Sequence, residues 1–303
     1  MSEPAIHAAR RGAVRVAQRA RRRIRLGRRW ALRASLDFQD TWSGRRNPLL
    51  PPRRMDLPSQ ISEIGERLVD LMIDLGRLAP DDAVLDIGCG PGRTAAALTR
   101  YLDPDRGRYE GFDVMPRSID WCSKAISPRH PSFRFRVADL HNAQYNPNGS
   151  QAACDYDFPY ADAEFDVAVA ASLFTHLRPF ESRRYLEEAD RVLRGGGRLL
   201  GTWFLLNAES RDLIAQGRAR QGGVFGEQRP PLELHEFSDE RGFEFASPHA
   251  EVPEHMILVD EELVRSLHER AGLRIVEVRY GRWAGREGGP AQFGQDLLVA
   301  ERS

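Results

Sequence analysis

A five-residue turn, Gly88-Cys-Gly-Pro-Gly92, contains the first residues whose types and spacing indicate chemistry. It follows the apolar run at residues 84–87 and precedes an alanine- and leucine-rich segment, which is the pattern of a strand, a tight turn and a helix. Glycine at these positions lets the backbone take positive φ and approach a ligand closely. The free N–H groups at the start of the helix favour polar or anionic groups. The turn therefore predicts a cradle for a small ligand.

An acidic residue stands in or at the end of each of the first three predicted strands: Asp86, Asp113 and Asp139. Ligands of open α/β sheets bind at the carboxyl ends of the strands. There Asp86 would face an amino group, Asp113 would bind two ribose hydroxyls, and Asp139 would accept a hydrogen bond from an adenine amino group. Taken singly, such acids are also common as helix caps or exposed loop residues. The glycine spacing is GxGxG, which matches neither the GxGxxG of dinucleotide sites nor a phosphate-binding P-loop.

The elements that must position these residues alternate between β and α patterns from about residue 59. Predicted strands cover residues 83–88, 108–114, 133–140, 164–174, 196–206, 273–281 and 294–302, and predicted helices cover 61–76, 92–102, 115–126, 179–193 and 260–272. Repeated β–α units predict a parallel sheet with helices on both faces. Residues 141–160 and 207–258 do not fit the alternation and are expected to be irregular.

Three motifs carry a resemblance to a known family: "VLDIGCGPGR", "FPYADAEFDVAVAASLFTHL" and "EADRVLRGGGRLLGTWF". From about Ser59 to Leu206, and in its last two predicted strands, the chain resembles the class I S-adenosylmethionine (SAM)-dependent methyltransferases. The segments "YNPNG" and "RYGRWAGR" add a similarity to bacterial members of types 11 and 12. The resemblance implies a Rossmann-like, doubly wound α/β fold. Its seven-stranded sheet would be mostly parallel with an antiparallel last strand, and would carry an N-terminal arm and an insertion after the fifth strand.

The resemblance also implies roles for individual residues. The turn would hold the methionine part of SAM, Asp113 the ribose and Asp139 the adenine edge, and Ser172 would lie near the sulfonium. The implied cofactor-binding set is Asp86, Gly88, Cys89, Gly90, Gly92, Asp113, Val114, Asp139, Leu140 and Ser172.

Methyl transfer from a sulfonium is an in-line displacement, in which the protein mainly aligns the reacting atoms. A base is needed only when the acceptor carries a proton. His176 in "SLFTHL" is the best-placed candidate base, with capping of the next helix or covering of the sheet edge as its alternative. His141 is a second candidate, and His249 and His255 would reach the site if their segment forms a lid.

Three aromatic residues are further candidates for the site, whereas motifs for metal ligands are missing. Trp203, Phe204 and Tyr160 would either line an acceptor pocket or belong to the core. No HxH or HExxH motif occurs, and no carboxylates cluster with ligand spacing, so no metal is predicted.

The expected domains are a basic arm and proline-rich strap at residues 1–58 and a methyltransferase domain at 59–303, with 207–258 as a lid or substrate insertion. Eleven arginines and no acid lie between Arg10 and Arg33, although the net charge of the chain is zero. This arm is either a solvated extension or a contact for an anionic surface. Three cysteines without a CxxC pair and the lack of an 18-residue apolar run favour a cytoplasmic protein without a transmembrane segment.

We therefore expect a SAM-dependent methyltransferase acting on a small-molecule acceptor, on an oxygen of a natural product or sugar-containing metabolite. An RNA methyltransferase and a non-catalytic SAM-binding subunit are the alternatives. The basic arm favours RNA, whereas neutral overall charge and the lack of a (D/N)PPY motif do not. An NAD-dependent reductase is disfavoured because GxGxxG and a Tyr-x-x-x-Lys pair are missing. Oligomeric state is left open.

Overall fold

The computed structural model describes residues 47–52, 55, 61–219, 230–287 and 294–303. The chain divides into two units, Met1–Ile61 and Ser62–Ser303. In the first unit, Asn47 begins a turn in which its side-chain oxygen accepts the N–H of Leu49. The predicted basic arm at residues 10–33 lies outside the described residues.

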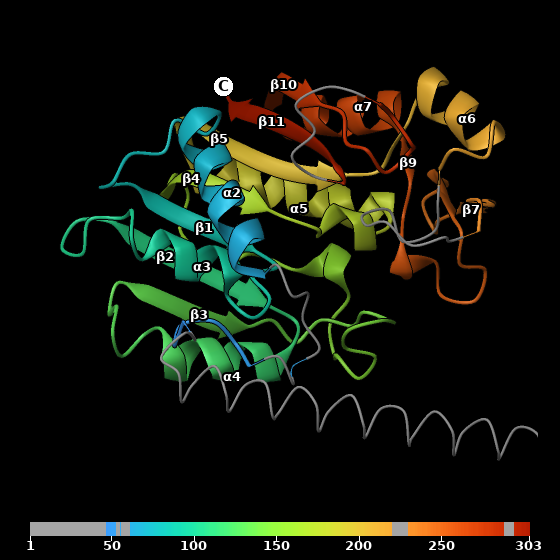
Figure 1. Ribbon diagram of the computed structural model, residues 1–303. Helices are drawn as coiled ribbons and strands as arrows, with labels where there is room; N and C mark the ends of the chain where they lie inside the picture. The colour runs from blue at the N-terminus through green and yellow to red at the C-terminus, as the bar shows by residue number, and fades with distance from the viewer. Residues whose placement is uncertain (1–46, 53–54, 56–60, 220–229, 288–293) are drawn as a thin grey trace, which may run out of the picture. The chain divides into compact units, whose positions relative to one another are not determined.

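A seven-stranded sheet forms the centre of the second unit (Figure 1). Its strands are β1 (Ala83–Ile87), β2 (Arg108–Asp113), β3 (Phe133–Val137), β4 (Phe165–Ala170), β5 (Leu193–Trp203), β10 (Leu273–Arg279) and β11 (Asp296–Arg302). They lie in the order β3-β2-β1-β4-β5-β11-β10. Strands β1 to β5 are parallel, and β11 runs antiparallel to both β5 and β10. This confirms the predicted doubly wound, Rossmann-like α/β sheet with an antiparallel last strand.

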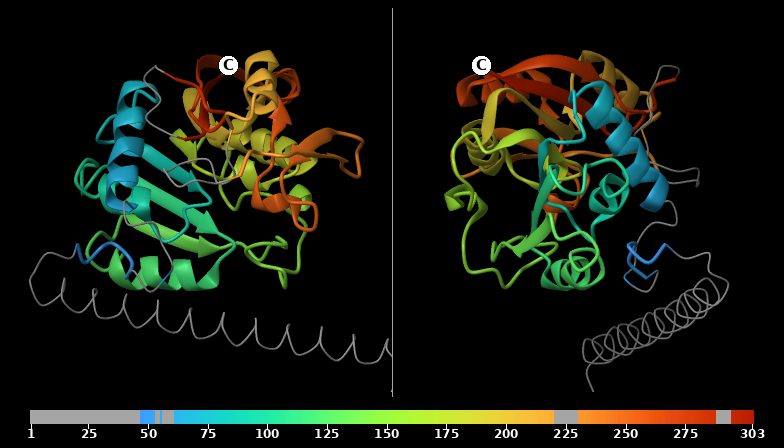
Figure 2. Two further views of the ribbon diagram at one scale, coloured as in Figure 1. Left: turned by 45° about the vertical axis from the view of Figure 1, so that its right-hand side comes forward. Right: turned by 90° about the vertical axis from the view of Figure 1, so that its left-hand side faces the viewer.

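The helices are α2 (Ile61–Asp74), α3 (Arg93–Leu98), α4 (Pro116–Ala125), α5 (Pro179–Val192), α6 (Ala208–Ala215) and α7 (Glu261–Ala271). The right-hand view in Figure 2 shows α2 and α3 on one side of the sheet and α5 on the other. Helix α2 approaches α3 so closely that a Cβ on Gly65 would lie 2.3 Å from the carbonyl oxygen of Arg93. Covering helices on both faces explain why every residue of β1 is buried, as expected for a parallel sheet.

The strand order changes direction between β1 and β4, which are neighbours in the sheet. The connection from β1 leads outward to β2 and β3, and the chain then returns to β4 on the other side. Loops at the carboxyl ends of β1 and β4 therefore diverge, and this position is where ligands bind in open α/β sheets. The glycine turn follows β1 at this position.

The segment at 207–258 is folded, contrary to the expectation of irregular structure. Besides α6, it contains a hairpin of β7 (His235–Ser238) and β8 (Glu244–Ser247) and the short helix η4 (Pro253–His255). The predicted fifth strand continues beyond β5 as β6 (Leu205–Leu206), which pairs with β9 (Val259–Asp260). Residues 220–229 of this segment lie outside the described residues.

A small hydrophobic core of its own stabilises this segment. Its members come from both ends of the insertion and from the stretch before β11: Phe204, Leu206, Leu213, Ala219, Leu232, Ala246, Met256, Leu258, Trp283 and Ala284. Fully burying a side chain of this size contributes roughly 1.5–3 kcal/mol. Because the members are widely spaced along the chain, no local periodicity indicated them.

Candidate functional site

The glycine turn has the backbone geometry of a ligand cradle. Gly88, Gly90 and Gly92 have φ values of 76°, 54° and 83°, in the left-handed region that glycine favours. The N–H groups of Gly88 and Cys89 donate to the carbonyl of Phe112, which ties the turn to β2. A Cβ on Gly90 would meet no atom within 4 Å. The backbone at Gly90 therefore faces open space.

Asp86 is a buried carboxylate beneath the turn, with 2% of its surface exposed. It accepts a hydrogen bond of 2.8 Å from the hydroxyl of Tyr109. Burial raises the pKa of Asp86 to about 6, although this hydrogen bond and the charge of Arg93 lower it. Asp86 thus joins β1 to β2, and its predicted contact with a ligand amino group stays a prediction.

Asp113, at the end of β2, joins the two turns that follow β1 and β2. One carboxylate oxygen accepts the N–H of Gly90 and the other accepts the N–H of Met115, both at 2.8 Å. Burial raises the pKa of Asp113, and these backbone hydrogen bonds oppose the shift. A carboxylate has about four acceptor positions, so about two stay available for a pair of hydroxyls.

The thiols beside the turn are buried and serve its packing. Burial raises the pKa of Cys89 well above its usual value, which makes its thiol a poor nucleophile. Cys122 on α4 lies so close that a Cβ on Gly92 would be 2.8 Å from its sulfur. Val114 is partly buried and packs against the main core. The predicted ligand contacts of Cys89 and Val114 stay predictions.

Ser172 and Arg93 lie where β4 ends. Ser172 has a φ of 61°, an uncommon conformation for a non-glycine residue and one that is frequent at functional sites. Its N–H donates to the hydroxyl of Thr202, and its own hydroxyl donates to the side chain of Gln295. Arg93 extends from α3 to donate to the carbonyl of Ala171 at 3.1 Å. Sequence reasoning missed Arg93, although its place directly after the turn was a signal.

His176 lies in η3 (Phe174–His176), between the insertion and the loop after β3. Its Nδ1 lies 2.7 Å from the carbonyl oxygen of Glu254, and its Nε2 lies 3.3 Å from the hydroxyl of Tyr145. Burial lowers the pKa of His176, and the nearby His255 lowers it further, against the hydrogen bond to Glu254. The histidine does not cap α5, because Arg178 occupies the N-cap position.

Comparison with known proteins identifies the domain that carries these residues. A family model described as a methyltransferase domain matches residues 84–197, which span the glycine turn, Asp113 and His176. This domain belongs to the class I SAM-dependent methyltransferases. SAM is the cofactor of that class.

Two curated methyltransferases are similar in sequence. The phthiotriol/phenolphthiotriol dimycocerosates methyltransferase of Mycobacterium tuberculosis is 33% identical over 154 residues, covering 48% of this chain and 47% of the relative. The 27-O-demethylrifamycin SV methyltransferase of Amycolatopsis mediterranei is 29% identical over 170 residues, covering 55% of this chain and 56% of the relative. The chain thus spans about half the length of the curated relatives it matches.

A solved structure agrees with the fold of the methyltransferase domain. The crystal structure of a Pyrococcus horikoshii protein superposes with a TM-score of 0.51 at 16% identity, covering 81% of this chain and 92% of that protein. At this level of identity the likeness shows the fold alone.

The residues at the carboxyl ends of β1 and β2 fit SAM. The open space at Gly90 accommodates a ligand close to the backbone, and Asp113 keeps acceptor positions for ribose hydroxyls. Asp139, in contrast, is exposed and accepts a hydrogen bond of 2.6 Å from the hydroxyl of Ser150. Leu140 is buried in the main core, and His141 is exposed. The predicted adenine contacts of Asp139 and Leu140 stay predictions.

The other candidates divide between core and surface. Trp203 stacks on Phe174 with ring centroids 4.3 Å apart, and Tyr160 packs edge-on against Phe165. Phe204 belongs to the small core of the insertion. All three predicted aromatic residues are therefore core residues. His249 and His255 are exposed, with their rings 5.1 Å apart.

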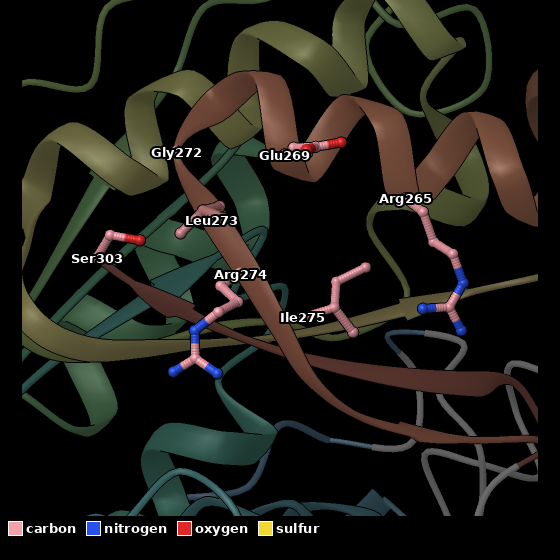
Figure 3. A pocket seen from close by; sticks show the side chains of 7 residues that line it. All are labelled: Arg265, Glu269, Gly272, Leu273, Arg274, Ile275 and Ser303. Carbon is pink, nitrogen blue, oxygen red and sulfur yellow. The ribbon is translucent and has the colours of Figure 1, made fainter.

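The methyltransferase domain has a hollow on its surface, away from the predicted site. A hollow of roughly 320 Å³ lies between α7, the edge strand β10 and Ser303 (Figure 3). None of the predicted site residues lines it, and three strands separate β10 from β1.

Among the described residues, no helix is long and apolar enough to cross a membrane, and no cluster of three His, Cys, Asp or Glu side chains could hold a metal.

Proposed function

We propose that this chain transfers a methyl group from SAM to an oxygen of a small-molecule acceptor, a natural product or a sugar-containing metabolite. The observation that carries the proposal is the glycine turn, with open space at Gly90 and both oxygens of Asp113 held by backbone N–H groups. Such a turn is pre-organised for a nucleoside ligand before the ligand arrives, which lowers the cost of binding.

SAM, when bound, supplies a methyl group on a positively charged sulfur. The chain's own residues then orient and protect the reactants: the turn and Asp113 bind the cofactor, and the loop after β4 lies beside it. His176 is neutral at pH 7, because its pKa lies below the usual 6.5. A neutral imidazole accepts a proton from an acceptor hydroxyl, and this is the reason for proposing transfer to oxygen.

The insertion supports a small acceptor rather than a macromolecule. Its residues contact the loop after β4, where Ile257 donates its N–H to the carbonyl of Thr175 and Glu254 meets His176. Segments that lie over an active site exclude water and limit the size of the acceptor. The two curated relatives named above are also named for methylation of small molecules, a rifamycin and phthiotriol lipids.

We place this activity in the cytoplasm. All three cysteines lie within the described residues and none forms a disulfide, which is typical of proteins from a reducing compartment. We also retain contact of the arginine-rich residues 10–33 with an anionic surface as a proposal. We likewise propose that the arm and strap, residues 1–58, are separate from the methyltransferase domain.

The test uses SAM with a deuterated methyl group and a bacterial metabolite extract, followed by mass spectrometry. Label on a small molecule supports the proposal and identifies the acceptor. Label confined to RNA added in parallel overturns the acceptor class in favour of an RNA methyltransferase. Binding of S-adenosylhomocysteine without label in any fraction favours the non-catalytic SAM-binding subunit.

Cofactor binding is tested separately by calorimetry with S-adenosylhomocysteine. Asp113→Ala removes the hydrogen bonds to the N–H groups of Gly90 and Met115 and the proposed acceptors for the ribose. We therefore expect the affinity for S-adenosylhomocysteine to fall by about 100-fold or more. Asp120→Ala is the matched control, because Asp120 is exposed and its ion pair among the described residues is with Lys124 on the same helix. Equal affinity in the two variants would contradict the assigned site.

A further inference from the structure

The hydrogen bonds of His176 determine which of its nitrogens carries the proton. Its Nδ1 lies 2.7 Å from the carbonyl oxygen of Glu254, and a carbonyl can only accept. The neutral ring therefore carries its proton on Nδ1, and Nε2 is an acceptor. The hydroxyl of Tyr145, 3.3 Å from Nε2, is the donor. Both nitrogens of His176 are thus engaged within the protein.

Tyr145 contacts His176 and is near two charged residues beside the cofactor-binding turn. Its ring packs edge-on against the imidazole, with centroids 5.2 Å apart. Burial and the charge of Asp113 raise the pKa of Tyr145, while the charge of Arg93 lowers it. Arg93 begins α3 directly after the glycine turn and Asp113 ends β2, so Tyr145 lies near both elements of the proposed SAM site.

The loop that carries Tyr145 is held in place by its own hydrogen bonds. The side-chain oxygen of Asn142 accepts the N–H groups of Gln144 and Tyr145, both at 3.0 Å. Asn142 and Asn146 also exchange backbone hydrogen bonds of 3.0 Å. This Asx turn fixes the backbone at the tyrosine, which pre-organises the hydroxyl against His176.

Exposure distinguishes the two members of the pair. Tyr145 is 39% exposed, whereas His176 is partly buried with both nitrogens occupied. The tyrosine oxygen still has lone pairs to accept a hydrogen bond while its proton points to Nε2. An acceptor hydroxyl therefore meets the tyrosine oxygen before it can meet the imidazole.

We propose that Tyr145 is the catalytic residue that touches the acceptor, and that it relays the acceptor proton to His176. The acceptor O–H proton passes to the tyrosine oxygen as the tyrosine proton passes to Nε2. The acceptor oxygen forms its bond to the methyl carbon, and the carbon–sulfur bond breaks to leave S-adenosylhomocysteine. The imidazolium then returns its proton to water. This relay rests on the proposed function, since it needs an acceptor that carries a proton.

Neighbouring charges bear on the pH dependence of the pair. His255, on η4, lies near His176 and lowers its pKa. Arg178 pairs with Glu254 at 2.7 Å and thereby holds the segment whose carbonyl binds Nδ1. Glu181, next to Arg178 on α5, has its pKa raised by burial to about 7. The titration of His176 must therefore be measured by a method that resolves individual residues.

Tyr145→Phe tests the relay, because it keeps the ring against His176 and removes only the hydroxyl. Tyr280→Phe is the matched control: Tyr280 is also 39% exposed and donates to Glu261 beyond the end of β10. Nitrogen-15 NMR of the full chain with bound S-adenosylhomocysteine reads the tautomer and pKa of His176. The hydroxyl is the partner of Nε2 in both protonation states of the ring, so the pKa of His176 should shift in Tyr145→Phe and stay unchanged in Tyr280→Phe.

Turnover with deuterated SAM and the acceptor found in the labelling experiment is the second readout. We expect kcat to fall by about 10²–10⁴-fold in Tyr145→Phe, with unchanged affinity for S-adenosylhomocysteine. In the unmodified protein kcat should rise with pH as His176 loses its proton, and this rise should be lost in the variant. An unchanged pKa of His176, or full turnover in the variant, would overturn the relay. If no methyl transfer is found at all, the proposed function fails, while the NMR readout still decides whether the pair exists.

Discussion

The cofactor side and the acceptor side of this domain are built in different ways. The cofactor side is local: the turn at 88–92 and the two strands beside it supply Asp86, Asp113 and the open space at Gly90. The acceptor side joins the loop after β3, the segment after β4 and the end of an insertion, so that Tyr145, His176 and Glu254 meet. A short motif encodes the first, and long-range packing assembles the second.

This difference separates two kinds of sensitivity to mutation. Changes on the cofactor side should act on ligand binding or on a single turn, because its contacts are within neighbouring strands. Changes on the acceptor side should act on the cohesion of distant segments. Variants on the two sides should therefore differ in whether binding or stability changes.

Asp296→Ala should cause the largest loss of stability, because Asp296 joins β11 to segments that are distant in the chain. The buried carboxylate of Asp296 accepts from the N–H of Leu205, from Trp283 and from Arg286. Its removal leaves these buried donors without their acceptor, at a cost of about 1–3 kcal/mol each, while Arg286 keeps its ion pair with Glu209. Urea denaturation measures this loss of stability. Asp162→Ala, which removes a largely exposed partner of Arg191, should change stability by less than about 1 kcal/mol, and equal losses would contradict the prediction.

Asp86 should make stability depend on pH. Its pKa rises from 3.8 in the unfolded chain to about 6 in the folded protein, so the folded state binds more protons between these values. Stability therefore falls as the pH rises from about 4 to about 6, by about 3 kcal/mol in total. Asp86→Asn should reduce this slope when thermal unfolding is followed across that range. A slope as steep as that of the unmodified protein would show that Asp86 is not its source.

A pair of glycine variants should separate ligand binding from folding. Gly92→Ala places a Cβ 2.8 Å from the sulfur of Cys122, on a residue whose φ is positive. It should therefore cost about 1–3 kcal/mol of stability. Gly90→Ala meets open space, so its loss of stability should be the smaller. Its affinity for S-adenosylhomocysteine, measured by calorimetry, should nevertheless fall by about tenfold or more. Weaker binding in Gly92→Ala than in a well-folded Gly90→Ala would reverse this interpretation.

Arg178→Met should have the smallest effect and be confined to the acceptor side. It removes the ion pair of Arg178 with the exposed Glu240 and its ion pair with the buried Glu254, and we expect a loss of about 1–2 kcal/mol. Hydrogen exchange should increase around η4 and leave the turn at 88–92 unchanged. Faster exchange throughout the domain would show that the insertion is not a separate cooperative region.

The predicted fold was confirmed because its signals are local. The run at 84–87 and the acid at 113 lie in strands whose alternation with helices is visible along the chain. The bounds of some elements differ: β3 ends at Val137 rather than at residue 140, where the N–H of Leu140 closes a turn onto the carbonyl of Ala138. The hairpin at 235–247 was missed because its apolar residues pack against distant segments rather than repeating with a regular period.

The sequence alone was enough to predict the glycine turn and the alternation of strands and helices, because the conformational freedom of glycine and the burial of parallel strands act within a few residues. The family followed from the resemblance of its motifs. The contacts of His176, in contrast, are visible only in the folded structure. Its partners Tyr145 and Glu254 are 31 and 78 residues away in the chain, and no local pattern encodes a contact across such separations. The tautomer of His176, and with it the proposed relay, follows from a carbonyl that folding brings to Nδ1.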